Sequence, residues 1–330
     1  MQTQMLPQPK TTPGWLPLVA DQLGLLAVLI LLITAFGLST QYFLTLDNFR
    51  TMANQIPATV LAAIGMTFVL IIAGIDLSVG SVLGLCGAVM GILMAPKGYA
   101  APLALAACAA LATGLACGAV NGLVTVRWAI PSFIVTLGML EVARGAAHLL
   151  TDSRTQYIGA PAAPIAGTHI LGLSLPFLIA IAAVIAGQLI LSRTVFGRYM
   201  IAIGTNEEAV RLSGIDPRPV KVAVFTIAGL LAALGAIVDV SRNETAVPDA
   251  GKGLELEVIA AVVIGGTSLM GGRGSVISSF LGVVIIVVLS NGLAAHGARD
   301  ETKRMITGFV IVLAVILDYY RRRLATRRAA

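Results

Sequence analysis

Charged and aromatic residues are scarce in this chain of 330 residues. Asp, Glu, Lys and Arg together make up 12% of it and aromatic residues 5%, whereas soluble domains carry about 25% charged residues. Hydrophobic residues reach 57%, and the mean hydropathy is +0.92. This composition excludes an ordinary soluble domain and predicts an integral membrane protein that crosses the bilayer several times.

Further absences limit the chemistry. The three cysteines, Cys86, Cys108 and Cys117, lie in apolar stretches without the close pairing of metal or redox sites, so we interpret them as packing residues. No GxxxxGK string followed by Ser or Thr occurs, so the chain is not expected to hydrolyse ATP. The net charge of +6 comes mainly from loop and tail arginines without interleaved aromatics. It indicates an anionic bilayer surface rather than nucleic acid. We therefore predict no catalytic residue, no metal site and no bound cofactor.

Windows of about 20 mainly apolar residues predict ten crossings. They are 18–38, 56–73, 78–94, 100–126, 130–150, 175–191, 220–240, 256–269, 275–295 and 305–319. The third and eighth are short and interrupted by glycine, which predicts broken or re-entrant helices. The expected fold is an all-α integral membrane protein with about ten transmembrane helices and short broken or re-entrant segments.

The positions of the arginines predict the topology. Five cationic side chains lie between Leu191 and Val222, and arginines are concentrated again at 321–328. Positive charge in short loops marks the cytoplasmic side. We therefore predict a cytoplasmic N-terminal tail over 1–15 and a single transmembrane domain over 16–320. Its loop 193–219 is expected in the cytoplasm, as is a basic C-terminal tail over 321–330.

Within that loop, the stretch NEEAVRL over 206–212 predicts a short helix. Thr205 or Asn206 is a suitable N-cap, acids occupy the first turn, and Gly214 follows the last turn. The pattern indicates a docking helix on the cytoplasmic side.

Two glycine-rich segments interrupt the apolar pattern. In AGIDLSVGSVLG over 73–84, Asp76 is either a functional acid or a cap for the next helix, with Ser78 as the competing cap. In GGTSLMGGRG over 265–274, five glycines and two hydroxyls allow tight turns and close helix approach.

Four blocks of the sequence together resemble one protein family. They are IDLSVGSVLG at 75–84, VNGLVTVRWAIPSFIVTLGML at 120–140, AIGTNEEAVRLSGI at 202–215 and EVIAAVVIGGTSLMGGRGSV at 257–276. They resemble the permease subunits of bacterial ABC importers for monosaccharides of the ribose, xylose and arabinose type, whose transport depends on a binding protein.

This resemblance implies a type II ABC importer permease fold in the bacterial inner membrane. It implies four partners: a cytoplasmic ABC ATPase that uses ATP and Mg²⁺, a periplasmic sugar-binding protein, a second permease copy or paralogue, and the lipid bilayer. It also places the coupling to the ATPase on Gly204, Asn206, Glu207, Ala209, Leu212, Ser213, Gly214 and Ile215. In such a helix Ala209 and Leu212 share one face, and Glu207 and Glu208 are available to basic partners.

A sugar path needs converging hydroxyls and amides. Candidate path or broken-helix positions are Asp76, Ser78, Asn121, Ser132, Thr136, Gly265, Gly266, Thr267, Ser268, Gly271, Gly272, Gly274 and Asn291. Each polar member can equally be a hydrogen-bonding link between helices. In the fifth crossing, the spacing of Glu141, Arg144 and His148 predicts a structural ion pair between Glu141 and Arg144.

Three alternative functions remain open at this point. A membrane scaffold or receptor without transport predicts neither a docking helix nor glycine-rich broken segments. A branched-chain amino acid ABC permease has a related architecture, but its zwitterionic substrate favours charged partners or helix termini in the path. An ion-coupled secondary transporter usually places an acid or a basic relay at mid-membrane, whereas the acids here lie mainly at ends and in loops.

Overall fold

The computed structural model describes residues 15–95, 99–170, 172–299, 301–303, 305–310, 312, 313 and 316, with side chains from Gln22 onward. The predicted tails, 1–15 and 321–330, lie outside these residues except for Trp15, which begins the first helix.

Helices dominate the described chain. They are α1 (Trp15–Ser39), α2 (Leu46–Gln55), α3 (Pro57–Ile71), α4 (Val79–Met94), α5 (Leu103–Arg127), α6 (Ser132–Thr151), α7 (Pro164–Gly167), α8 (Leu175–Arg193), α9 (Val195–Leu212), α10 (Arg218–Asn243), α11 (Leu254–Ile264) and α12 (Val276–Ala295), with a 3₁₀ turn at Ala160–Ala162. Short antiparallel pairs join β1 (Gln156–Tyr157) to β4 (Thr245–Ala246) and β2 (His169–Ile170) to β3 (Leu173–Ser174).

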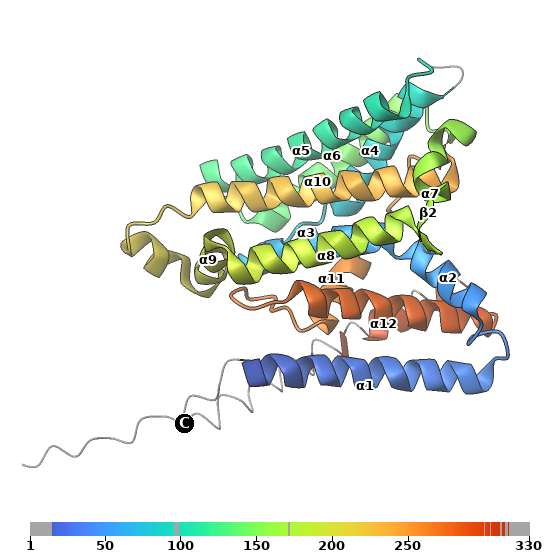
Figure 1. Cartoon of the computed structure of the whole chain (residues 1–330). Helices are drawn as coiled ribbons and strands as arrows, with labels where there is room; N and C mark the ends of the chain where they lie inside the picture. The colour runs from blue at the N-terminus through green and yellow to red at the C-terminus, as the bar shows by residue number, and fades with distance from the viewer. Residues whose placement is uncertain are drawn as a thin grey trace, which may run out of the picture.

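The long helices lie roughly parallel, with α9 at one end of the bundle and α7 with β2 at the other (Figure 1). Among the described residues six helices are long and apolar enough to cross a membrane, and the bent pair α2–α3 makes a seventh. Helix α4 has 16 residues and α11 only 11, so neither passes this test alone. A helical membrane protein is therefore confirmed, whereas the predicted count of ten is not. The predicted tenth crossing lies partly outside the described residues.

The core forms where α10 packs against α5 and α3. An ideal Cβ on Gly118 of α5 would lie 2.3 Å from the carbonyl oxygen of Phe225 in α10. A Cβ on Gly229 of α10 would lie 2.1 Å from the carbonyl oxygen of Gly114 in α5. A Cβ on Gly65 of α3 would lie 2.9 Å from the Cα of Ala228 in α10. In lipid, helix association depends on such close van der Waals packing of small residues. These glycines therefore set the spacing of the three central helices.

The two predicted interruptions are confirmed as non-helical segments. Residues 72–78 join α3 to α4, and residues 265–275 join α11 to α12. A third non-helical segment, 247–253, precedes α11, and its Gly251 lies against Gly80 at the start of α4. Non-helical backbone at membrane depth requires internal hydrogen-bond partners. The partners of the first two segments identify the candidate site described below.

The central packing makes a direct prediction. Replacing Gly118 with leucine inserts a side chain where even a Cβ would overlap the α10 backbone, so α5 and α10 must separate. Overpacking of this kind costs about 1–3 kcal/mol or more. We expect a clearly lower melting temperature of the detergent-solubilised protein. Gly24→Leu is the control, because no atom lies within 4 Å of a Cβ at Gly24 in α1. Equal melting temperatures for the two variants would contradict the packing described.

Candidate functional site

The segment at the end of α9 has the form predicted for a docking helix. Helix α9 is kinked: Asn206 has φ −161° and ψ 97°, which are not helical, and divides it into two helical pieces. The side chain of Asn206 accepts a hydrogen bond from the amide of Ala209 at 2.9 Å, and Gly214 follows the last turn with φ +85°. The predicted N-cap and C-terminal glycine are therefore confirmed. The preceding helical piece, 195–205, was not predicted.

The short piece exposes apolar surface. Leu212 is 80% exposed and Ala209 is exposed as well, next to a shallow and mainly apolar groove lined in part by Ala202 and Val210. Ser213 donates to the carbonyl of Val210, and Ile215 is half-buried. An exposed leucine in a polar loop has no role in the packing of this chain.

The two acids of this piece differ from what we predicted. Glu207 accepts from the ammonium group of Lys221 at 2.9 Å and lies 3.7 Å from the guanidinium of Arg211, so it is paired within the chain. Glu208 reaches Arg211 only at 4.0 Å, and its side chain is 69% exposed. Of the two, Glu208 is the acid left available to a partner, because Glu207 holds the docking piece against the start of α10.

Three backbones meet at Gly204, two residues before Asn206. An ideal Cβ on Gly204 would lie 1.7 Å from the carbonyl oxygen of Ile71 and 2.5 Å from the amide of Gly272. That amide donates to the same Ile71 carbonyl at 2.8 Å. Gly271 and Gly272 both have positive φ, which glycine adopts without strain. We call this contact of Gly204, Ile71, Gly271 and Gly272 the glycine junction. It joins the first helical piece of α9, 195–205, to the end of α3, where the first broken segment begins, and to the second broken segment.

The first broken segment is held by hydroxyl groups of α6. Ser132 accepts from the amide of Ile75 at 2.9 Å, and Thr136 accepts from the amide of Leu77 at 3.0 Å. Thr136 also donates to the Ile75 carbonyl at 3.2 Å. These two side chains supply partners that a helix would otherwise provide.

Asp76 and Asn121 complete this network. Asp76, 4% exposed, accepts from the amide of Ser78 at 2.8 Å and from its hydroxyl at 2.6 Å, and Asn121 of α5 donates to the same hydroxyl at 2.9 Å. Asp76 therefore forms a turn onto Ser78 rather than a cap on the amides near Val79. Five candidate path positions thus lie in one buried network, where they link helices. The carbonyl oxygen of the Asn121 side chain is buried without a partner.

The second broken segment is closed by its own hydroxyl groups. The hydroxyls of Thr267 and Thr67 both contact that of Ser279, at 3.4 and 2.8 Å, and Ser268 accepts from the amide of Met270. Gly265 lies against the backbone of α12, Gly266 has φ +86°, and Gly274 lies against Thr267. Asn291 lies in α12, away from this segment in sequence, and its buried side-chain oxygen has no hydrogen-bond partner among the residues that the structure describes.

The predicted ion pair between Glu141 and Arg144 is not formed. Arg144 instead donates to the carbonyl oxygens of Pro248 and Ala250 at 2.7 and 2.8 Å. His148 lies 3.5 Å from Asp249. No salt bridge to Glu141 occurs among the described residues. Arg144 and His148 of α6 therefore contact the segment before α11, a long-range contact that local spacing does not reveal.

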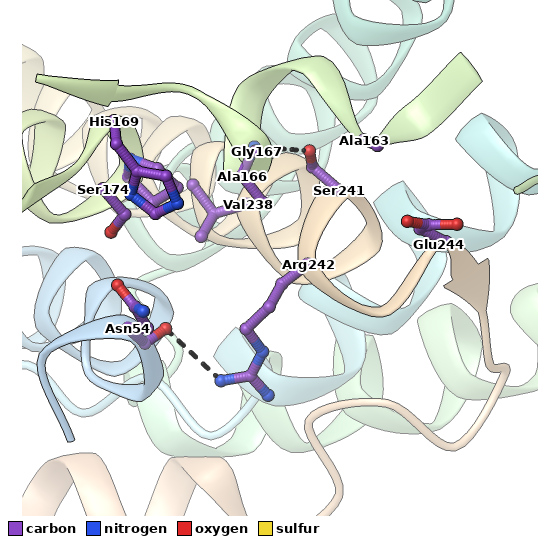
Figure 2. A pocket seen from close by; sticks show the side chains of 11 residues that line it. Asn54, Ala163, Ala166, Gly167, His169, Ser174, Val238, Ser241, Arg242 and Glu244 are labelled. Carbon is purple, nitrogen blue, oxygen red and sulfur yellow. Dashed lines mark hydrogen bonds between the residues drawn. The ribbon is translucent and has the colours of Figure 1, made fainter. Parts of the chain in front are cut away.

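Figure 2 shows a pocket at the opposite end of the bundle from α9. Its volume is about 270 Å³, and His169, Ser174, Arg242 and Glu244 line it. Arg242 donates to the backbone carbonyl of Asn54 at 3.5 Å. The hydroxyl of Ser174 is buried without a partner. No sequence signal indicated this pocket, because its residues come from four separate parts of the chain.

The hydroxyl network of α6 makes a testable prediction. Thr136→Val leaves the half-buried amide of Leu77 without its acceptor, and an unsatisfied buried group costs about 1–3 kcal/mol, the upper limit here. We expect a lower melting temperature in detergent. Thr113→Val is the matched control, since the Thr113 hydroxyl bonds only within α5, to the carbonyl of Ala109. If both valine variants had the melting temperature of the wild-type protein, Thr136 would not support the broken segment.

Comparison with known proteins identifies the family. Residues 48–315 match the family described as "Branched-chain amino acid transport system / permease component". The chain is 38% identical to the ribose import permease protein RbsC of Escherichia coli K12 over 312 residues, which cover 93% of this chain and 95% of that protein. It is 36% identical to RbsC of Bacillus subtilis (91% and 93% covered) and 33% identical to the D-allose transport system permease protein AlsC of Escherichia coli K12 (90% and 91%). No solved structure matches it significantly. The chain therefore belongs to the permease family of ABC importers that contains these ribose and D-allose permeases.

Proposed function

We propose that this chain is the transmembrane subunit of an ATP-driven importer for a monosaccharide or related polyol. The observation that carries the proposal is similarity over nearly the whole chain to permeases named for ribose and D-allose. The chain itself makes and breaks no covalent bond. It provides the route through the membrane, while a separate subunit hydrolyses ATP with Mg²⁺.

In this proposal, residues 206–215 dock on the cytoplasmic ATPase. The exposed Leu212 and Ala209 present an apolar face, and Glu208 adds a negative charge beside it. A helix that lays an apolar face into a groove is a common mode of protein recognition. The cap at Asn206 and the ion pair of Glu207 with Lys221 hold this face in place before the partner binds.

The glycine junction then transmits movement of the docking helix into the membrane. Its backbones touch without intervening side chains, so a displacement at Gly204 must displace Ile71 and Gly272 as well. Ile71 ends α3 directly before the first broken segment, and Gly272 belongs to the second. Alternating access would follow from rocking of these segments with their helices, since a packed contact passes on displacement directly.

In the same proposal, the chain lies in the bacterial inner membrane with both termini in the cytoplasm. It has a type II importer fold of about ten crossings. A second permease copy or paralogue completes the transmembrane part, and a periplasmic binding protein delivers the sugar to the end that carries α7 and the pocket of Figure 2.

A branched-chain amino acid permease is the competing function, because the family description names that substrate class. The full-length relatives described above are named for sugars, which favours a neutral polyhydroxylated substrate. An ion-coupled secondary transporter has less support, because the chain belongs to a family of ABC importer permeases and Asp76 is engaged by Ser78 in a buried network.

The test is uptake into vesicles that hold the chain, its ATPase and its binding protein. Labelled ribose, allose, a sugar alcohol and leucine would be offered with ATP or with an ion gradient alone. ATP-dependent uptake of a sugar or polyol is the expected result. Uptake of leucine only, or uptake driven by a gradient without the ATPase, would overturn the proposal.

Docking makes a specific prediction about Leu212. Leu212→Asp places a charge in the proposed apolar contact, where a central residue typically carries 2 kcal/mol or more, so ATP-dependent uptake should fall at least about tenfold. Binding of the ATPase to the solubilised chain should weaken in parallel. Leu105→Asp is the control, since Leu105 is also an exposed leucine but lies at the start of α5. Equal uptake by both variants would show that Leu212 does not dock.

The glycine junction makes a different prediction. Gly204→Ala forces α9 away from Ile71 while leaving the exposed docking face unchanged. ATP hydrolysis should continue, whereas sugar imported per ATP should fall by roughly 5-fold or more, the lower range of allosteric coupling. Gly24→Ala, in open space on α1, should behave as wild type. Fully coupled transport by Gly204→Ala would contradict transmission through this contact.

A further inference from the structure

An exposed carboxylate lies at the middle of a membrane-spanning helix. Glu141 follows the start of α6 by nine residues and precedes its end by ten. At 1.5 Å per residue each end is about 14–15 Å away, which places Glu141 near the centre of a hydrocarbon core of about 30 Å. The side chain is exposed rather than packed inside the bundle. A charged group at this depth is costly in lipid and normally faces protein or water.

Arg144, the cation three residues after Glu141 in α6, does not neutralise this carboxylate by direct contact. The guanidinium of Arg144 is held by the carbonyl oxygens of Pro248 and Ala250. The carboxylates of Asp249 and Glu255 attract it, as does that of Glu141 from beyond ion-pair distance. Glu141 therefore keeps acceptor oxygens that no donor occupies among the described residues.

A second charged surface lies at membrane depth beside α6. The segment before α11 follows α4 inward: Ala246 lies against Gly91, and Gly251 lies against Gly80, eleven residues earlier in α4. This run corresponds to roughly 16 Å along the helix. Asp249 and Lys252, in the inner part of the segment, have side chains 52% and 74% exposed. Arg144 ties this segment to α6, so its charges and Glu141 belong to one region.

The surface around Glu141 is also open. Gly138 and Gly145 lie three residues before and four residues after Glu141, on the same side of α6, and a Cβ at either would meet no atom within 4 Å. Exposed charges such as those of Glu141, Asp249 and Lys252 are costly in lipid. This open surface is therefore expected to face a water-filled compartment.

We propose that Glu141 lines the translocation path and accepts hydrogen bonds from hydroxyl groups of a neutral polyhydroxylated substrate. This inference rests on the proposed function. Both oxygens of a carboxylate accept hydrogen bonds, so adjacent hydroxyls of a sugar are suitable donors. Hydrogen bonds to an ionised acceptor are roughly twice as strong as neutral ones, yet a single carboxylate leaves the substrate free to move on. Asp249 and Lys252 keep the compartment hydrated.

The first experiment tests the compartment without transport. Glu141→Cys and Leu115→Cys would each be treated with a membrane-impermeant methanethiosulfonate reagent in permeabilised vesicles, with the wild-type chain as the blank for its own cysteines. Leu115 is the control because it is exposed near the middle of α5, in an apolar stretch. We expect labelling of Cys at 141 and none at 115. An unreactive Cys at 141 would place this face in lipid or against the second permease subunit, and either result would overturn the inference.

The second experiment tests contact with the substrate. In the vesicle assay, Glu141→Leu should lower uptake of the transported sugar at subsaturating concentration by about tenfold, and Glu141→Gln by less, because the amide still accepts one set of hydrogen bonds. Excess unlabelled sugar should slow the labelling of Cys at 141. Wild-type uptake by Glu141→Leu, or labelling that sugar does not slow, would overturn the contact. If the wild-type chain itself showed no ATP-dependent uptake, the proposed function would fail, while the labelling result would still decide whether water reaches Glu141.

Discussion

The structure depends on one constraint: every backbone amide and carbonyl inside a membrane needs a partner within the protein. Helices meet this requirement by themselves, but residues 72–78 and 265–275 do not. Ser132 and Thr136 supply partners to the first segment, and the Ile71 carbonyl accepts from the amide of Gly272 in the second. In the sequence these hydroxyl side chains look like substrate ligands, but in the structure they bond to the backbone. Substrate contacts must therefore be sought among polar groups that such bonds do not engage.

The same constraint brings distant parts of the chain together at the proposed cytoplasmic end. Because the amide of Gly272 donates to the carbonyl of Ile71, the second broken segment lies against the end of α3. Gly204 of α9 packs against both residues. The docking piece begins two residues later, at Asn206. One layer of backbone contacts, the glycine junction, therefore separates the proposed ATPase-docking piece from the two broken segments.

Local features could be predicted from the sequence, and remote pairings could not. Asn206 and Gly214 act on their immediate neighbours, so their capping roles were evident, and glycine runs marked both broken segments. Arg144 was misassigned because its partners, Pro248 and Ala250, lie more than 100 residues away. Helix 195–205 was missed because its mixture of polar, β-branched and glycine residues lacks a clear helical period. The number of crossings stays a prediction, because apolar length does not reveal where a helix is broken and part of the predicted tenth crossing lies outside the described residues.

The shortness of α11 has a consequence for biosynthesis. Its 11 residues span about 16 Å, roughly half of the hydrocarbon core, and they follow a segment without helical hydrogen bonds. Such a segment cannot leave the translocon alone, because its free amides and carbonyls would enter lipid. Its partners lie elsewhere in the protein: Gly251 lies against Gly80 of α4, and Arg144 of α6 donates to the carbonyl oxygens of Pro248 and Ala250. A stable position of α11 in the bilayer therefore depends on α4 and α6, which are far earlier in the sequence.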